Sequence, residues 1–291
     1  MTISRTVNVP SIAIRFLSLG KRAVSVRRFA LVVLAWALLP SASAEAGRQS
    51  VTVPVTEPQA ATLTGDLFTP SGNGPHPAVI LLHGCSGVTQ NTTTWAMWLQ
   101  SEGYAALVLD SFTGRGLRTV CGDPRPLTGQ VRASDVFAAA VRLKSLGFID
   151  ENRIAAMGFS HGGWTVLSAW RTQARHPEAM LKALMAFYPA CAPTLPEGVA
   201  PPLLMLLGGQ DDWTPAQPCL KLAETASKAG LPVNAILYPD ARHAFDAANL
   251  RGRVYVDVAR GGKGATIEYN PKAHDDSQKQ VRQFLRTQLA P

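Results

Sequence analysis

Short apolar runs without polar interruptions recur along most of the chain and predict buried β-strands. These runs lie at residues 78–82, 105–109, 154–159, 183–187, 203–207 and 233–238. They lack the in-and-out alternation of a half-exposed strand, as expected for parallel strands that helices cover on both faces. Residues 51–55 and 61–68 flank a polar turn and predict an antiparallel pair that precedes the parallel strands.

Helical patterns separate these strands. They lie at residues 94–102, 130–146, 162–171 and 219–229, and a final helix is expected at 275–289, with Val281, Phe284, Leu285 and Leu289 on one face. Strands that alternate with helices predict an α/β fold, built on a mostly parallel, doubly wound sheet of about eight strands with helices on both faces. No repeat or long linker divides residues 45–291, so we expect a single domain there.

The first 44 residues are expected to be a secretory signal peptide. They contain six Lys and Arg residues and no acidic residue, and an apolar run at 29–39 precedes the small residues 41–44. This order predicts cleavage after Ala44 and a periplasmic or secreted protein. A membrane anchor is the alternative, but eleven apolar residues rise only about 16 Å as a helix, against a hydrocarbon core of ~30 Å. The arginine pair at 27–28 leaves the twin-arginine route open.

The signal peptide also explains most of the positive charge. The whole chain has 28 Lys and Arg against 20 Asp and Glu, a net charge of +8. Removal of the six basic residues of the signal peptide leaves 22 against 20, so the mature chain has a net charge of only +2. This balance argues against a nucleic-acid or anionic-membrane partner, and no stable membrane insertion is expected after cleavage.

Four cysteines remain after the signal peptide, at Cys85, Cys121, Cys191 and Cys219. An even number in an exported protein indicates disulfides, with three possible pairings, and free buried thiols are the alternative. No two of them have C-x-x-C spacing and the six histidines are scattered, so we expect neither a metal nor a cofactor.

A candidate nucleophile follows the strand at 154–159. Residues 158–162 read Gly-Phe-Ser-His-Gly and match G-x-S-x-G, with Ser160 at the centre. The pattern alone is weak, but here it lies between a predicted strand and a predicted helix, where the tight turn of a nucleophile elbow needs these glycines. The sequence therefore predicts that Ser160 is the nucleophile of an α/β-hydrolase fold.

A serine nucleophile needs a base, and the base needs an orienting carboxylate; in this fold they follow in the order Ser, acid, His. His243 lies in the loop after the strand at 233–238 and is the expected base. Asp211 and Asp212 lie after the strand at 203–207 and compete for the role of acid. The spacing G-x-x-D-x-x-x-P favours Asp211, which leaves Asp212 as a surface or helix-capping carboxylate.

The tetrahedral intermediate of acyl transfer needs two backbone N–H donors. His161 follows the nucleophile at a helix start and is the expected first donor. The second is expected from the His-Gly-Cys-Ser-Gly loop at 83–87, at the N–H of Cys85, while His83 itself is interpreted as structural.

These segments together resemble the dienelactone hydrolase family, from about Leu63 to the final helix. The resemblance is carried by the residues at 83–84, 103–104, 110–112, 158–163 and 211–215, and by the turn that contains His243. It implies a hydrolase of small esters and lactones that uses a nucleophile, a histidine and an aspartate without a cofactor. The family's name-giving enzymes have cysteine where this chain has Ser160 and glutamate where it has Gly84. A small carboxylic ester or lactone is therefore expected rather than dienelactone itself.

The same triad also serves peptidases and acyltransferases, and a binding protein can retain the fold without turnover. These remain the alternative functions. The products formed in the presence of a competing alcohol or peptide distinguish an acyltransferase or a peptidase from an esterase. A binding protein shows no turnover.

In the fold that the resemblance implies, the cysteines lie in two pairs of neighbouring loops. Cys85 and Cys121 belong to loops at the same sheet edge, and Cys191 and Cys219 belong to adjacent connections, so we expect these two disulfides. The loops at 111–127, 188–201 and 250–271 are expected to wall the pocket. Arg115, Arg118 and Arg125 in the first loop could attract an anionic substrate, but solvated side chains are favoured, as is a packing role for Trp164 and Trp213.

Overall fold

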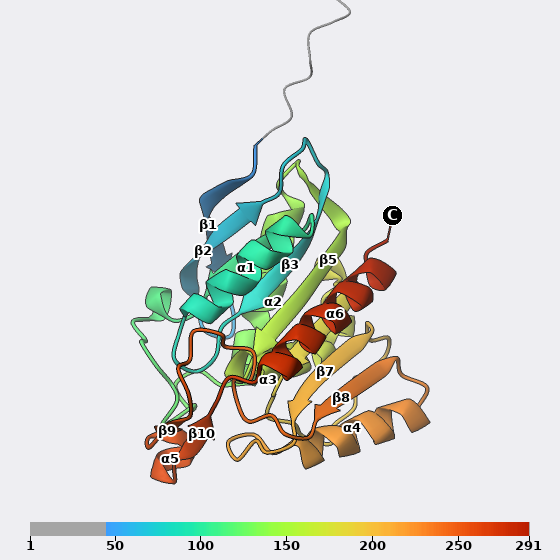
Figure 1. Cartoon of the computed structure of the whole chain (residues 1–291). Coiled ribbons are helices and arrows are strands. Elements are labelled where there is room, and N and C mark those ends of the chain that lie inside the picture. Colours follow the sequence, from blue (N-terminus) through green and yellow to red (C-terminus); the bar gives the residue numbers. More distant parts are fainter. Residues whose placement is uncertain (1–44, 291) are drawn as a thin grey trace, which may run out of the picture. The chain divides into compact units, whose positions relative to one another are not determined.

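The computed structural model describes residues 45–290, which contain one eight-stranded sheet with the order β1-β2-β4-β3-β5-β6-β7-β8 (Figure 1). Its strands are β1 (Gly47–Val55), β2 (Ala61–Thr69), β3 (His76–Leu82), β4 (Ala105–Asp110), β5 (Ile149–Phe159), β6 (Ala183–Phe187), β7 (Leu203–Gly208) and β8 (Val233–Tyr238). β2 pairs antiparallel with both β1 and β4, and every other pair is parallel. The predicted mostly parallel sheet is thereby confirmed, while the predicted signal peptide lies outside the described residues.

The five larger helices cover both faces of this sheet. They are α1 (Gln90–Ser101), α2 (Gly129–Lys144), α3 (His161–Thr172), α4 (Ala216–Lys228) and α6 (Pro271–Gln288). Along β3, Ile80 packs in a core that includes α2, α3 and α4, whereas the next residue, Leu81, packs in a core that includes α1 and α6. Because both faces of the strand are buried, it reads as an unbroken apolar run.

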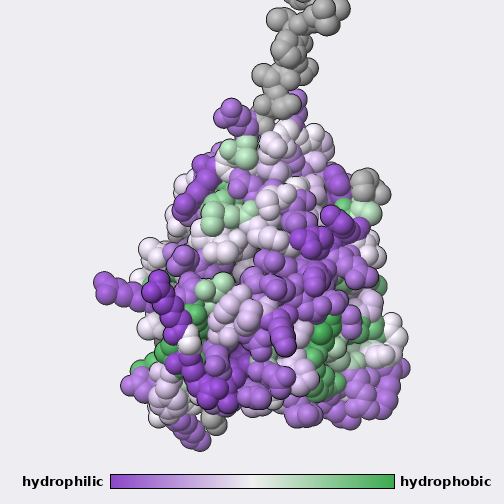
Figure 2. All heavy atoms as spheres, viewed as in Figure 1, coloured by the Kyte–Doolittle hydropathy of each residue, from purple (hydrophilic) through white to green (hydrophobic). Residues whose placement is uncertain are grey.

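The surface view agrees with this layering. The outer side of α6 is largely hydrophilic (Figure 2), as expected for a helix that buries one stripe against a sheet. No helix within residues 45–290 combines the length and the apolar character that a membrane crossing requires.

Several elements begin earlier than the apolar pattern predicted. α6 starts at Pro271, because the side chain of Asn270 accepts a hydrogen bond from the N–H of Ala273 and proline suits the first turn of a helix. β5 starts at Ile149, where its pairing with β3 is irregular. In both cases the extra turn or strand segment is polar and partly exposed, so hydrophobic periodicity does not reveal it.

The region at 250–271 was expected to be a loop and instead contains three short elements. β9 (Val254–Val256) and β10 (Ala265–Ile267) form an antiparallel pair, with the single-turn helix α5 (Ala259–Gly262) between them. The two strands have only three residues each, and β9 is largely exposed, so neither produces an apolar run as long as those of the main sheet. We call residues 250–271 the C-terminal flap.

Two disulfides join Cys85 to Cys121 and Cys191 to Cys219, and no cysteine within residues 45–290 is free. The expected pairing is confirmed, and the alternative of free thiols is wrong. Cys191 lies in the connection after β6 and Cys219 lies in α4, so this bridge fixes the loop that precedes β7 to the helix that follows it.

Replacement of both Cys191 and Cys219 by serine is expected to lower the free energy of unfolding by roughly 3 kcal/mol, because the bridge closes a long loop in the unfolded chain. Denaturant titration of oxidised protein measures the change. The double variant of Cys85 and Cys121 to serine is a second test and is expected to lose a similar amount of stability, because its bridge closes a loop of similar length. Unchanged denaturation midpoints in both variants would contradict this expectation.

Candidate active site

The turn at Ser160 joins β5 to α3 in a strained backbone conformation. Ser160 has φ +54°, which is unusual for a residue other than glycine and costs on the order of 1–3 kcal/mol. Its N–H donates to the carbonyl of Phe187 over 3.0 Å. A side chain at Gly158 would overlap the carbonyl of Gly162, and one at Gly162 would overlap the carbonyl of Leu82. Only glycines therefore fit at these two positions, as the sequence motif predicted.

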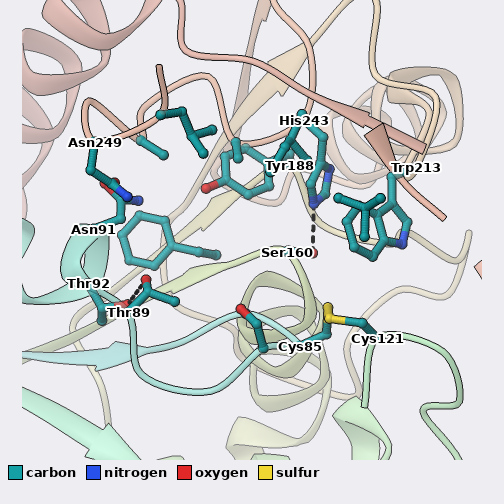
Figure 3. A pocket seen from close by; sticks show the side chains of 18 residues that line it. Cys85, Thr89, Asn91, Thr92, Cys121, Ser160, Tyr188, Trp213, His243 and Asn249 are labelled. Atoms are coloured by element: carbon teal, nitrogen blue, oxygen red, sulfur yellow. Dashed lines mark hydrogen bonds between the residues drawn. A yellow bond between two sulfur atoms is a disulfide. The ribbon is translucent and has the colours of Figure 1, made fainter. Parts of the chain in front are cut away.

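The structure brings Ser160, His243 and Asp211 together at the carboxyl edge of the sheet. His243 Nε2 lies 2.9 Å from Ser160 Oγ (Figure 3), and His243 Nδ1 lies 2.7 Å from Asp211 Oδ2. The imidazole is buried, and a carboxylate at Nδ1 favours the tautomer whose unprotonated Nε2 faces the hydroxyl. These contacts are those that a serine nucleophile requires for activation by a general base.

Asp211 is held as a carboxylate by its own loop. Its Oδ1 accepts hydrogen bonds from the N–H groups of Trp213 and Thr214, each over 2.8 Å. Burial alone would raise the pKa of Asp211, but His243 and these hydrogen bonds outweigh it and keep the pKa below its usual value. The side chain therefore stays negative at neutral pH.

Asp212 has a different role from the surface or capping role expected for it. Its Oδ1 accepts a hydrogen bond of 2.8 Å from the N–H of Thr266 in β10, and it does not cap α4. The flap is also joined to the histidine loop, because the N–H of Glu268 donates to the carbonyl of His243. The two neighbouring aspartates therefore have different contacts: Asp211 contacts the imidazole of His243, and Asp212 holds the C-terminal flap through Thr266.

A second buried carboxylate lies behind the histidine and was missed by the sequence analysis. Asp246 is fully buried and accepts hydrogen bonds from Tyr188 Oη at 2.6 Å, Trp95 Nε1 at 2.8 Å and Asn91 Nδ2 at 2.8 Å. The ring of Tyr188 lies against that of His243, with 4.6 Å between the centroids. Asp246 thereby ties the histidine loop to α1 and to the end of β6. Tyr188 comes directly after a buried strand, and this position could have indicated from the sequence that Tyr188 belongs to the site.

Thr214 is the other residue near the imidazole that the sequence analysis missed. Its hydroxyl lies 3.0 Å from Asp211 Oδ2, 3.1 Å from His243 Nδ1 and 2.9 Å from the carbonyl oxygen of Tyr188. The hydroxyl has a single proton, so it donates to only one of these neighbours at a time. It packs the acid and the histidine against the end of β6.

Two backbone N–H groups flank Ser160. His161 opens α3, and Cys85 lies in the loop after β3, where its carbonyl accepts from the N–H of Val120 over 2.8 Å. Within residues 45–290 neither the N–H of His161 nor that of Cys85 donates to another group of the protein. This loop lies close to the serine, since a Cβ at Gly84 would be in ordinary contact with Ser160 Cβ, at 3.7 Å. Both predicted oxyanion donors thus belong to segments next to Ser160 and are uncommitted.

A buried arginine connects the two segments that carry these N–H groups. Arg132 Nη1 donates to the carbonyl of His83 at 2.8 Å and to His161 Nδ1 at 3.1 Å, and Nε donates to Ser111 Oγ at 2.9 Å. Burial lowers the pKa of Arg132 to about 10, so the guanidinium stays charged at neutral pH. Arg132 thus fixes the oxyanion loop relative to the nucleophile turn.

His161 and His83 are both held neutral beside this cation. Burial, and then the charge of Arg132, lower the pKa of His161 to about 3, and its Nε2–H donates to the carbonyl of Leu127 at 2.9 Å. Burial also places the pKa of His83 well below its usual value. His83 Nδ1–H donates to the carbonyl of Gly84, and Nε2 accepts from the N–H of Ser111. These contacts agree with the structural role that the sequence suggested for His83.

Two cavities open on either side of Ser160. The first has a volume of about 230 Å³ and is lined in part by His243, Tyr188 and the flap residue Ile267. The second has a volume of about 360 Å³ and is lined in part by Val120 and Trp164. Trp213 and the disulfide between Cys85 and Cys121 line both. All three predicted loops contribute to the walls. The two tryptophans pack as expected, Trp164 against His161 and Trp213 against His243, and they also line the cavities.

The basic loop after β4 does not bring free charge to these cavities. Arg115 forms a two-pronged ion pair with the buried Asp135, at 2.7 and 2.9 Å, and Arg125 is paired with Asp123. Arg118 is exposed and lines neither cavity. The expected solvated state is therefore confirmed for Arg118 and Arg125 and is wrong for Arg115, whose side chain is buried against Asp135. Among the described residues no group of three or more His, Cys, Asp or Glu side chains is arranged to bind a metal ion.

Comparisons with known proteins agree with this geometry. A sequence profile of the dienelactone hydrolase family matches residues 63–289. A protein of Methylorubrum extorquens named "Putative carboxymethylenebutenolidase" is 27% identical over 61% of this chain and 66% of its own length. A protein of the same name from Escherichia coli is 30% identical over 60% of this chain and 69% of its own length. The chain thus covers just under two thirds of the first relative and slightly more of the second.

Solved structures share the fold. A dienelactone hydrolase-like promiscuous phosphotriesterase from metagenomic libraries superposes with a TM-score of 0.66 at 19% identity, over 84% of this chain and 99% of that one. An esterase from Thermogutta terrifontis superposes with a TM-score of 0.61 at 16% identity, over 83% and 94%. This chain belongs to the dienelactone hydrolase family and has the α/β-hydrolase fold.

The low pKa of His161 predicts a loss of stability in mild acid. The imidazole is neutral in the folded protein down to a pH of about 3, whereas in the unfolded chain it binds a proton below its ordinary pKa of about 6.5. Protonation of His161 therefore favours the unfolded chain between these values, with a slope of up to ~1.4 kcal/mol per pH unit.

Denaturant unfolding at pH 7, 6, 5 and 4 measures this dependence. The His161→Asn variant removes the titrating group and is expected to show a shallower slope than the unmodified protein, by up to one proton. Identical slopes for the two proteins would show that His161 is not held neutral by the fold.

Proposed function

We propose that this member of the dienelactone hydrolase family is an exported serine hydrolase that cleaves small carboxylic esters or lactones through an acyl-enzyme intermediate. The observation that carries the proposal is the continuous hydrogen-bonded chain from Ser160 Oγ through His243 to Asp211. The cavities on both sides of the hydroxyl and the two uncommitted N–H groups beside it support the same function.

In the first step Ser160 Oγ attacks the carbonyl carbon of the ester, and His243 Nε2 accepts the hydroxyl proton. Asp211 stabilises the imidazolium that forms. The bond between Oγ and the carbonyl carbon forms, the carbonyl oxygen gains the negative charge, and the N–H groups of Cys85 and His161 donate to it. The positive end of the α3 dipole adds to this stabilisation.

In the second step the bond to the leaving oxygen breaks and His243 gives its proton to that oxygen, which releases the alcohol. A water molecule then attacks the acyl-enzyme, with His243 as general base. The serine regains its proton when the acid leaves. A lactone follows the same path, with both products in one hydroxy acid. Every proton is transferred through His243 Nε2, so no metal or cofactor is needed.

The two disulfides support an exported location. Disulfides persist in oxidising compartments and are rare in reducing ones, and all four cysteines of this chain are paired. Together with the predicted signal peptide, they favour the periplasm or the exterior of the cell.

Replacement of Ser160 by alanine tests the nucleophile. We expect kcat/KM for p-nitrophenyl acetate to fall by at least about 10⁴-fold, because the variant loses covalent catalysis while its fold is unchanged. Ser227→Ala, at an exposed position near the end of α4, is the matched control and is expected to retain full activity. Hydrolysis by the Ser160 variant at the rate of the unmodified protein would refute the proposal.

The paired aspartates offer a second test. Asp211→Asn is expected to lower kcat by about 10⁴-fold, because an amide cannot stabilise the imidazolium or select its tautomer. Asp212→Asn keeps an oxygen that can accept from the N–H of Thr266 and is expected to retain most of the activity. Steady-state kinetics of the two variants distinguish the residues, and equal losses would contradict the role of Asp211.

A further inference from the structure

The two cavities at Ser160 share a chemical property. Among the described residues, their walls contain no Lys, Arg, Asp or Glu side chain. The first cavity is lined by apolar groups that include Phe159, Ala247 and Leu250, and by the neutral amides of Asn91 and Asn249. In the view of Figure 3 these amides lie on the opposite side of the cavity from Trp213.

The second cavity is also mostly apolar at its walls. Val120, Pro124 and Ala190 line it, and Trp213 lies against the ring of His243. Its polar side-chain groups are the hydroxyls of Ser160 and Thr214, the imidazole of His161 and the indole N–H groups of Trp164 and Trp213. Burial holds His161 neutral, so among the side chains that the structure describes none brings a positive charge to this cavity.

The buried charged residues around the site do not line a cavity. Asp211 contacts His243, and Asp246 accepts hydrogen bonds from three neutral donors. Arg132 donates through Nε and Nη1, while its buried Nη2 has no partner among the described residues. A charged substituent that enters either cavity would lose its hydration without a partner of opposite charge, which is unfavourable.

We propose that the substrate is an uncharged ester with an apolar group on each side of the scissile bond. This inference rests on the proposed function and narrows its substrate class. It departs from a lactone that carries a free carboxylate, for which these walls provide no partner.

The position of His243 also assigns the cavities. The leaving oxygen takes its proton from His243, so the alcohol part lies on the side of His243, which lines only the first cavity. The acyl part lies on the other side of the carbonyl carbon from the leaving oxygen, and the second cavity also opens at Ser160. The first cavity is therefore assigned to the alcohol part of the ester, and the second to the acyl part.

Two pairs of substrates of nearly equal size test the charge preference with the full mature protein. The acyl pair is p-nitrophenyl hydrogen terephthalate and its methyl ester, in which the para carboxyl group cannot reach the scissile ester, and the alcohol pair is para-acetoxybenzoate and its methyl ester. Each rate is divided by the rate of the same ester with hydroxide, which removes differences in intrinsic reactivity. In both pairs we expect kcat/KM for the anionic member to be at least about tenfold lower. Equal rates, or a preference for the anionic member in either pair, would overturn the inference.

Two variants that each add one positive charge test the assignment of the cavities. Leu250 lines the first cavity and is half-buried, and Ala190 lines the second and is exposed, so an arginine can be accommodated at either position. Leu250→Arg is expected to raise relative activity on the anionic alcohol only, and Ala190→Arg on the anionic acyl group only. The reverse pattern, or an equal effect on both pairs, would overturn the assignment.

The outcomes separate this inference from the function on which it rests. If the unmodified protein hydrolyses both members of each pair equally and Ser160→Ala abolishes this activity, only the substrate class is wrong. If Ser160→Ala hydrolyses the four esters as fast as the unmodified protein, the serine mechanism fails and the inference fails with it.

Discussion

The turn at Ser160 is the constraint on which the rest of the site depends. A serine at φ +54° persists only because β5 on one side and α3 on the other fix its backbone, and because glycines let the carbonyls of neighbouring segments approach. This turn directs the hydroxyl away from the sheet toward the loops that follow β7 and β8. From those loops His243 contacts the hydroxyl and Asp211 contacts His243, without any unusual conformation of β7 or β8.

Buried polar groups hold these loops in place with little help from ion pairs. Arg132 is wholly buried and uses neutral acceptors to join the oxyanion loop to the nucleophile turn. Asp246 is wholly buried and uses neutral donors to join the histidine loop to α1. A buried charge is costly without hydrogen bonds, so the bonds that Arg132 makes through Nε and Nη1, and those that Asp246 accepts, favour a single arrangement of the loops around them. Arg132 Nη2 is buried without a partner among the described residues. The disulfide between Cys85 and Cys121 adds a covalent restraint at the same edge of the sheet.

The sequence predicted the parts of the site that follow from strand ends. Ser160, Asp211 and His243 each come directly after a buried apolar run, and the carboxyl ends of parallel strands meet at one edge, so their proximity could be inferred. Arg132 and Asp246 could not be found in this way, because their partners lie far away in the sequence and a helix or loop position does not reveal which way a side chain is buried. The strands of the C-terminal flap were missed for a different reason, since three residues are too few to show a hydrophobic pattern.

The central claim is that Ser160 becomes a reactive nucleophile through His243. Its most direct measurement is peptide mass spectrometry of the purified protein after reaction with a fluorophosphonate, which forms a stable adduct with an activated serine. The account predicts one adduct, on the peptide that contains Ser160, and none when His243 is replaced by alanine. An unlabelled Ser160, or a label that persists without His243, would contradict the account.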